Sequence, residues 1–181
     1  MSDSASLLEE LPGELILWVL IVSEFAVFCA GLLVFLSLRL GDPALFSASQ
    51  GELHRMAAGI NTIVLVTSGW AAARAVASVK GGKAARGWLL LAAALGAVFL
   101  GVKAVEYGDA FAKGIGIETN AFFTFYFLLT GFHAAHVVAG IVILCLVAIR
   151  PQVQPVEAGA QFWHMVDLVW VLLLPIVYLL P

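Results

Sequence analysis

Residues 122–149 read FFTFYFLLTGFHAAHVVAGIVILCLVAI, a run without a single Asp, Glu, Lys or Arg. A helix rises about 1.5 Å per residue, so this run is long enough to cross the roughly 30 Å hydrocarbon core of a bilayer. Four further apolar runs lie at about residues 15–38, 53–79, 88–107 and 162–180. The pattern predicts an all-α membrane protein, built as a bundle of five transmembrane helices.

The composition excludes several classes of protein. The chain has 181 residues, of which 62% are hydrophobic and 12% charged, whereas soluble domains carry about 25% charged residues. A soluble enzyme is therefore excluded. The net charge of −3 leaves no basic stripe for nucleic acid. The two cysteines, Cys29 and Cys145, lie in apolar runs and exclude a disulfide scaffold, a cysteine zinc site and an iron–sulfur cluster.

The chain divides into a leader, residues 1–14, and one transmembrane domain, residues 15–181. Short separators predict that consecutive helices pack as antiparallel neighbours. Lysines and arginines are unequally shared between the two ends of the bundle. One end carries Arg74, Lys80, Lys83, Arg86 and Arg150, and the other carries Arg39, Arg55 and Lys113. This bias predicts a cytoplasmic N-terminus, with the leader in the cytoplasm, and a periplasmic C-terminus.

Polar side chains inside the first three spans are candidates for function. Glu24 falls near the middle of its span, where a carboxyl is expected to be protonated or paired; it is either a proton-handling group or a hydrogen-bonded structural one. Asn61 and Thr62 are expected to hydrogen-bond between helices. Lys103 and Glu106 are three residues apart and share a helix face, which favours an ion pair over a proton or substrate path.

Histidines occur in the last two spans. His133 and His136 share a face near the middle of span four, and His164 and Asp167 have the same spacing at the start of span five. The first pair supplies only two ligands for a metal or haem, and the remaining histidines, His54 and His164, lie at span ends. We therefore expect interhelical hydrogen bonds from His133 and His136, structural anchoring by the second pair, and neither metal nor cofactor.

Small residues recur four apart on span four, at Gly131, Ala135 and Ala139. Such a row lets helices approach closely in a membrane. It predicts a packing face, either within the bundle or toward a partner.

Five segments, taken together, resemble subunit III of the haem–copper oxidases. They are VSEFAVF with Glu24, INTIVLVTSG with Asn61 and Thr62, KAVEYGDAF with Lys103 and Glu106, FYFLLTGFHAAHVVAG with His133 and His136, and FWHMVDLVWVLLLPIVY with His164 and Asp167. The resemblance runs from Leu15 to Leu180 and covers the last five of the family's seven helices. Among five-span members the chain looks most like the NorE-type protein associated with nitric oxide reductase.

The resemblance implies a subunit without a redox centre that packs beside the catalytic subunit and supports its proton uptake and stability. It places Glu24 on the family's carbodiimide-reactive intramembrane carboxylate and the first retained helix against the catalytic subunit. The family holds lipids in a cleft between its first two helices and the rest of the subunit, and those two helices have no counterpart here. The implied orientation agrees with the lysine and arginine bias.

These observations favour an accessory, non-catalytic subunit in a bacterial inner membrane. Its expected partners are membrane lipids and the catalytic subunit of nitric oxide reductase, or alternatively of an oxygen-reducing cytochrome c or quinol oxidase. A second alternative is a small proton-conducting or transport protein that uses Glu24, Lys103 and Glu106, although no repeat supports it. A haem b carrier is a third, which an absorbance spectrum would reveal.

Overall fold

The computed structural model describes residues 15–180, and the predicted leader, residues 1–14, lies outside the described residues. All the regular structure within 15–180 is helical. The helices are α2 (Leu15–Gly41), α3 (Pro43–Gly51), α4 (Arg55–Lys80), α5 (Arg86–Ala112), α6 (Ala121–Ile149), α7 (Val153–Leu174) and the π-helix η1 (Pro175–Leu179). Five of these segments, with α7 and η1 counted as one, are long and apolar enough to span a membrane. The chain is therefore a multi-pass membrane protein.

Two separators expected as loops are helical. Residues 43–51 form α3, which starts at Pro43 after Asp42 caps the helix by accepting a hydrogen bond from the Leu45 amide, 3.1 Å away. Helix α7 begins at Val153 rather than at Phe162. Pro155 lies in its first turn, where the missing amide hydrogen has no intrahelical partner to lose. The polar residues 152–161 concealed this start in the hydropathy pattern.

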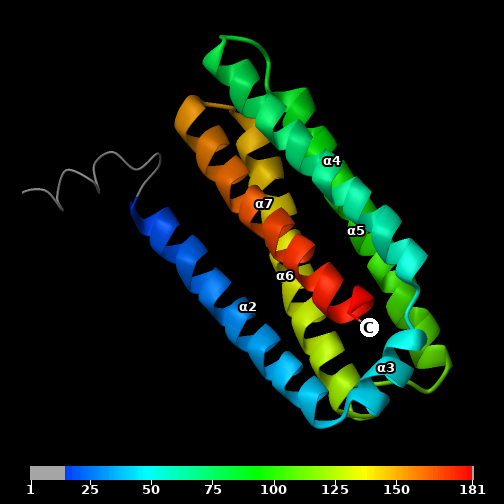
Figure 1. Cartoon of the computed structure of the whole chain (residues 1–181). Coiled ribbons are helices and arrows are strands. Elements are labelled where there is room, and N and C mark those ends of the chain that lie inside the picture. The colour runs from blue at the N-terminus through cyan, green and yellow to red at the C-terminus, as the bar shows by residue number, and fades with distance from the viewer. Residues whose placement is uncertain (1–14, 181) are drawn as a thin grey trace, which may run out of the picture.

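The expectation that consecutive spans are neighbours holds for α4 to α7 but is wrong for the first pair. Helix α2 packs on α6 and α7 instead of on α4. The reason is α3, which crosses one end of the bundle and carries the chain from α2 to α4 (Figure 1). Only 17% of the most apolar stretch of α2 is buried within the chain, against 50% of the last span. Helix α2 is therefore the peripheral helix.

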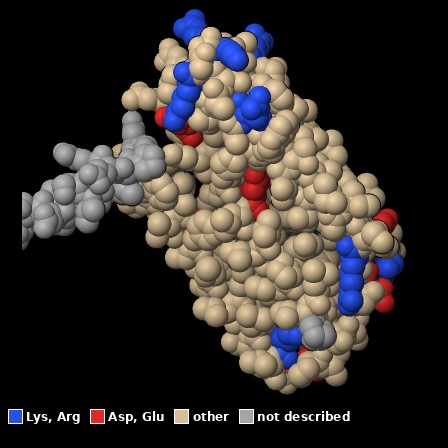
Figure 2. Space-filling view, turned by 45° about the horizontal axis from the view of Figure 1, so that its top comes forward, with Lys and Arg blue, Asp and Glu red and all other residues tan. Residues whose placement is uncertain are grey.

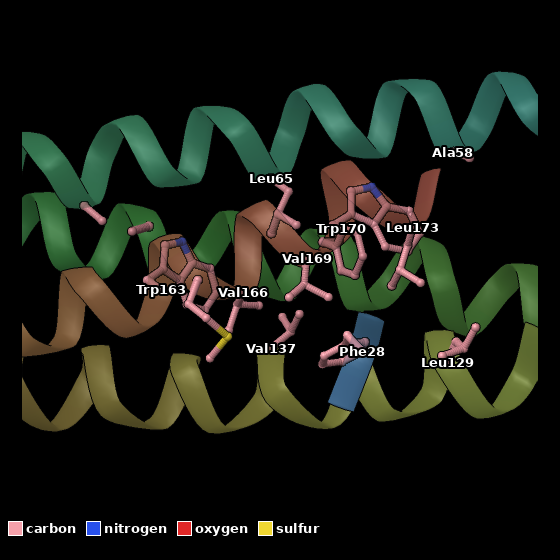
Figure 3. Close-up of a cluster of buried hydrophobic side chains, with 14 of the residues drawn as sticks. Phe28, Ala58, Leu65, Leu129, Val137, Trp163, Val166, Val169, Trp170 and Leu173 are labelled. Carbon is pink, nitrogen blue, oxygen red and sulfur yellow. The ribbon is translucent and has the colours of Figure 1, made fainter. Parts of the chain in front are cut away.

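Helix α7 provides the centre of the core. Figure 3 shows its side chains directed into the space between α4 and α6, with Phe28 of α2 closing one side. Trp163 and Trp170 of α7 are both fully buried. The Trp163 ring fills a slot between two glycines, because a Cβ on Gly96 or on Gly140 would lie 2.5 Å from it. Small residues thus allow close helix approach, as in other membrane bundles.

The expected packing row on α6 does not face the bundle. Ala135 and Ala139 are exposed and Gly131 is only half-buried, so these residues are available to lipid or to a partner. The glycine of α6 that packs inside the subunit is Gly140. The four-residue spacing identified a face of small residues correctly but could not tell the inner face from the outer one.

Lysines and arginines gather at one end of the molecule, at the turn between α4 and α5, while its middle is uncharged over most of the face shown in Figure 2. Gly82, at a φ of 66°, makes this turn with a backbone conformation that suits glycine. The opposite end holds α3 and the α5–α6 turn, where acidic and basic residues are mixed. The two ends therefore differ in charge.

Candidate functional site

Lys103 and Glu106 of α5 form a buried ion pair. Lys103 Nζ lies 2.9 Å from Glu106 Oε2, and these side chains are 3% and 6% exposed. The same ammonium donates to the hydroxyls of Tyr126 on α6 and Tyr178 on η1, at 3.1 and 2.9 Å. These three acceptors match the three hydrogens of an ammonium group. Tyr178 in turn donates to Glu106 Oε1 over 2.9 Å, which joins three helical segments in one network.

Aromatic rings complete the surroundings of the lysine. Its Nζ lies 4.8–5.6 Å from the ring centres of Tyr107, Tyr126, Trp170 and Tyr178. The negative faces of such rings attract a cation at these distances. The lysine charge is therefore stabilised by one carboxylate, two hydroxyls and an aromatic cage.

Asn61 and Thr62 of α4 make contacts with two other helices. Asn61 Nδ2 donates to the Phe99 carbonyl of α5 over 3.1 Å. Thr62 Oγ1 bonds to the Ala58 carbonyl in its own helix and accepts a hydrogen bond from Trp170 Nε1 of α7, at 2.9 Å. These bonds position Trp170, which belongs to the aromatic cage around Lys103.

Glu24 and His136 meet at the contact between α2 and α6. His136 Nε2 lies 3.0 Å from Glu24 Oε2. The other ring nitrogen, Nδ1, lies 2.9 Å from the Phe132 carbonyl and is thereby oriented. The Glu24 and His136 side chains are 25% and 15% exposed. The sequence indicated two separate polar groups, and the fold makes them one pair near the lipid-facing surface.

His133 behaves differently from His136 despite the shared helix face. It is 1% exposed, and neither ring nitrogen has a hydrogen-bond partner within residues 15–180. The expected interhelical hydrogen bond of His133 is therefore absent from the described part of the chain. Its ring packs against Trp170 and Phe99, with ring centres 5.3 and 5.5 Å away. Although only three residues separate the two histidines, the imidazole of His133 faces α5 and α7, and that of His136 faces α2.

His164 and Asp167 of α7 face α4. His164 Nδ1 lies 3.7 Å from Asp167 Oδ2, and the side chains are 47% and 12% exposed. A Cβ on Gly69 would overlap Asp167, so only glycine leaves room for the carboxylate there. The pair lies apart from the Lys103 network. Because α7 begins at Val153, the pair lies near the middle of the last span and not at its start, where the sequence had placed it. This placement fits a pair that anchors α7 to α4.

Three participants could not be identified from the sequence. Tyr126 and Tyr178 lie 23 and 75 residues from Lys103 in the chain, and both lie within apolar runs of the sequence. Ser68 was equally inconspicuous, but its Oγ accepts a hydrogen bond from Trp163 Nε1 and donates one to the Ala92 carbonyl, at 3.0 and 2.7 Å. A hydroxyl at helical spacing within an apolar run is the only signal that could have pointed to them.

Metal-ligating side chains are dispersed. No three of the His, Cys, Asp and Glu residues between positions 15 and 180 converge on a point where they could share a metal ion. Cys29 and Cys145 are exposed and unpaired in this region.

Comparison with known proteins assigns the family. The model of the cytochrome c oxidase subunit III family matches residues 56–180, which include α4 to α7. The chain belongs to this family. It is 33% identical to cytochrome c oxidase subunit 3 of Synechocystis over 88% of this chain and 72% of the relative. It is 31% identical to cytochrome c oxidase subunit 3 of Thermostichus vulcanus, over 91% of this chain and 85% of the relative.

A quinol-oxidase relative is similar over a shorter stretch. Cytochrome bo(3) ubiquinol oxidase subunit 3 of Pseudomonas aeruginosa is 32% identical over 67% of this chain and 63% of the relative. These relatives carry the names of oxidase subunits, so they give no support to the likeness to a NorE-type protein. Family membership implies a haem–copper oxidase catalytic subunit as partner.

The carboxyl at Glu24 is expected to react with a hydrophobic carbodiimide. Such reagents attack protonated carboxyls in apolar surroundings. Glu24 is the most exposed of the three intramembrane carboxylates, at 25% against 12% for Asp167 and 6% for Glu106. Labelling followed by peptide mass spectrometry should locate the adduct on Glu24. It should disappear in Glu24→Gln and persist in Glu106→Gln. An adduct on Glu106 in the unmodified chain would contradict this assignment.

Proposed function

We propose that this chain is the non-catalytic subunit III of an oxygen-reducing haem–copper oxidase in a bacterial inner membrane, and that it stabilises the catalytic subunit and assists its proton supply. The observation that carries the proposal is the family match over α4 to α7, the helices that hold the buried polar network. The names of the relatives favour an oxidase over nitric oxide reductase as the complex. No redox centre of its own is required for this role.

The orientation belongs to the same proposal. The end that carries Arg74, Lys80, Lys83, Arg86 and Arg150 faces the cytoplasm, in accord with the bias of lysine and arginine toward that side. The end that holds α3 and the α5–α6 turn then faces the periplasm. Glu24 and His136 lie between the two ends, where a polar pair is costly unless it is covered by protein or reached by water.

The face offered to the catalytic subunit is on α2. This helix buries the smallest share of its length within the chain, and its exposed residues near the Glu24–His136 pair include the small side chains Ser23, Ala26 and Ala30. Association between helices in lipid depends on close packing and polar contacts because the hydrophobic drive is weak. A helix of the catalytic subunit packed here would cover the polar pair.

Ala30→Trp is expected to release the catalytic subunit without unfolding this one. Ala30 is exposed, so the indole would obstruct the partner and not the bundle. Gly31, one residue further along, faces inward, because a Cβ there would lie 2.7 Å from Leu129 Cδ2. Gly31→Trp should therefore damage the chain itself.

The measurement is co-purification with the catalytic subunit, combined with circular dichroism of the isolated chain. Ile63→Trp is the matched control, because Ile63 is 68% exposed on α4, away from α2. It should leave both helix content and co-purification unchanged. Undiminished co-purification with Ala30→Trp would show that this face of α2 is not the interface.

A further inference from the structure

Two hollows share three lining residues near the end of the bundle that contains α3 and the α5–α6 turn. The inner one, about 10 Å³, is lined among others by Glu52, Ala110 and Tyr126. The outer one is a groove of about 580 Å³ whose apolar walls include Ala57 of α4 and Val98 of α5. His54, Glu106 and Asp109 line both hollows. Of the buried ion pair, Glu106 therefore lines both hollows, whereas Lys103 lines neither.

Glu106 lies at the inner limit of this path. Its carboxylate is 6% exposed, and one oxygen is next to Lys103 while the other accepts the hydrogen bond of Tyr178. It lies six residues before Ala112, where α5 ends, which corresponds to about 9 Å along the helix. A carboxylate that lines a hollow at this depth is accessible to a molecule in that hollow, whereas a carboxylate sealed inside the core is not.

The outer end of the path carries exposed titratable groups. His54 Nε2 and Asp109 Oδ2 are 3.9 Å apart, and both side chains are more than half exposed. Glu52 and Lys113 form a second pair beside them, at 3.2 Å. The inner hollow has room for about one water molecule, and such a water would have polar partners on both sides. Histidine is suited to exchange protons near neutral pH.

We propose that Lys103 and Glu106 form a proton-exchange site that is open to the aqueous phase at the α3 end of the bundle through His54 and Asp109. One proton passes from the His54 imidazolium to water, and the water returns a proton to Glu106. His54 becomes neutral, the carboxylate becomes a carboxylic acid, and the lysine charge remains. The reverse transfer restores the starting state, so that only one proton moves.

Polar groups from several elements surround Glu106. Lys103 and Asp109 come from α5 itself, Tyr126 from α6 and Tyr178 from η1. The segment between α3 and α4 contributes Glu52 and His54, and Lys113 closes the α5 end. The site is distinct from the Glu24–His136 pair between α2 and α6. The site is built from residues of this chain without any contribution from a partner subunit, and it goes beyond the proposed role beside an oxidase.

The first test uses infrared spectroscopy of the purified full chain with Lys103→Met. Without its cation, Glu106 should be protonated and give a carboxylic acid C=O band that is missing from Lys103→Met/Glu106→Gln. The band should shift in D2O as quickly as the solvent is replaced. Adding Ala110→Leu fills the inner hollow and should slow the shift by about tenfold or more, because exchange then needs a local opening. The proposal would be overturned if the band does not shift in D2O. It would also be overturned if the band shifts equally fast with and without Ala110→Leu.

A second measurement decides the question if Lys103→Met fails to fold or gives no band. Glu106→Cys is made in the Cys29→Ser/Cys145→Ser background and treated with a small, water-soluble thiosulfonate. Rapid reaction that Ala110→Leu suppresses supports the open path. Ala92→Cys is the control, because Ala92 is fully buried away from both hollows and should stay unmodified. A Glu106→Cys thiol as inert as the Ala92→Cys thiol would show that the ion pair is sealed.

Discussion

Lys103→Met lowers the free energy of unfolding by about 3–5 kcal/mol, the usual cost of removing one partner from a buried ion pair. The loss is expected because Glu106 then has no cation beside it and must take up a proton to remain buried, while two tyrosine hydroxyls lose their donor. Methionine is also unbranched and is only one heavy atom shorter than lysine, so little volume is lost. Unfolding of the purified chain by a denaturing detergent, followed by circular dichroism, measures the effect.

Lys80→Met is the matched control for this prediction. Lys80 pairs with Glu157 at the surface, where its side chain is 58% exposed, and exposed pairs contribute about 0–1 kcal/mol. The double variant Lys103→Met/Glu106→Gln should recover a large part of the loss, because glutamine is neutral without taking up a proton. If Lys103→Met and Lys80→Met lower the free energy of unfolding by equally small amounts, the buried network does not hold the bundle together.

Trp163→Ala is expected to destabilise the chain by about 3–5 kcal/mol, as large-to-small changes of buried aromatic residues do. The indole fills the slot between Gly96 and Gly140 and donates to Ser68, so its removal leaves a cavity and takes away one of the two hydrogen bonds of the Ser68 hydroxyl. Trp70→Ala provides the control, because Trp70 is 54% exposed. The same detergent titration should show a much smaller change for Trp70→Ala, and a comparable change would contradict the role of the slot.

The sequence predicted the features that depend on neighbours along one helix. Long apolar runs predicted the five spans, and the three-residue spacing of Lys103 and Glu106 predicted their ion pair. Local spacing cannot show which helices become neighbours. The tyrosines that complete the network come from α6 and η1, and the partner of Glu24 is His136, more than a hundred residues away.

The same limit explains the differences between prediction and structure. His133 and His136 share a face by spacing, but packing against different helices gives one an aromatic enclosure and the other a carboxylate. The row at Gly131, Ala135 and Ala139 is a face of small residues, but only the arrangement of the bundle shows that it points outward. Hydropathy also hid α3, because its residues are too mixed to resemble a span.

The most direct test of the central claim is affinity purification of the tagged chain from its native membranes in mild detergent. We expect the catalytic subunit of an oxygen-reducing haem–copper oxidase to co-purify, identified by mass spectrometry and by the haem absorbance and oxygen consumption of the complex. The Ala30→Trp variant should lose that subunit and the haem absorbance with it. Recovery of nitric oxide reductase subunits instead, or of this chain without any haem–copper protein, would contradict the account.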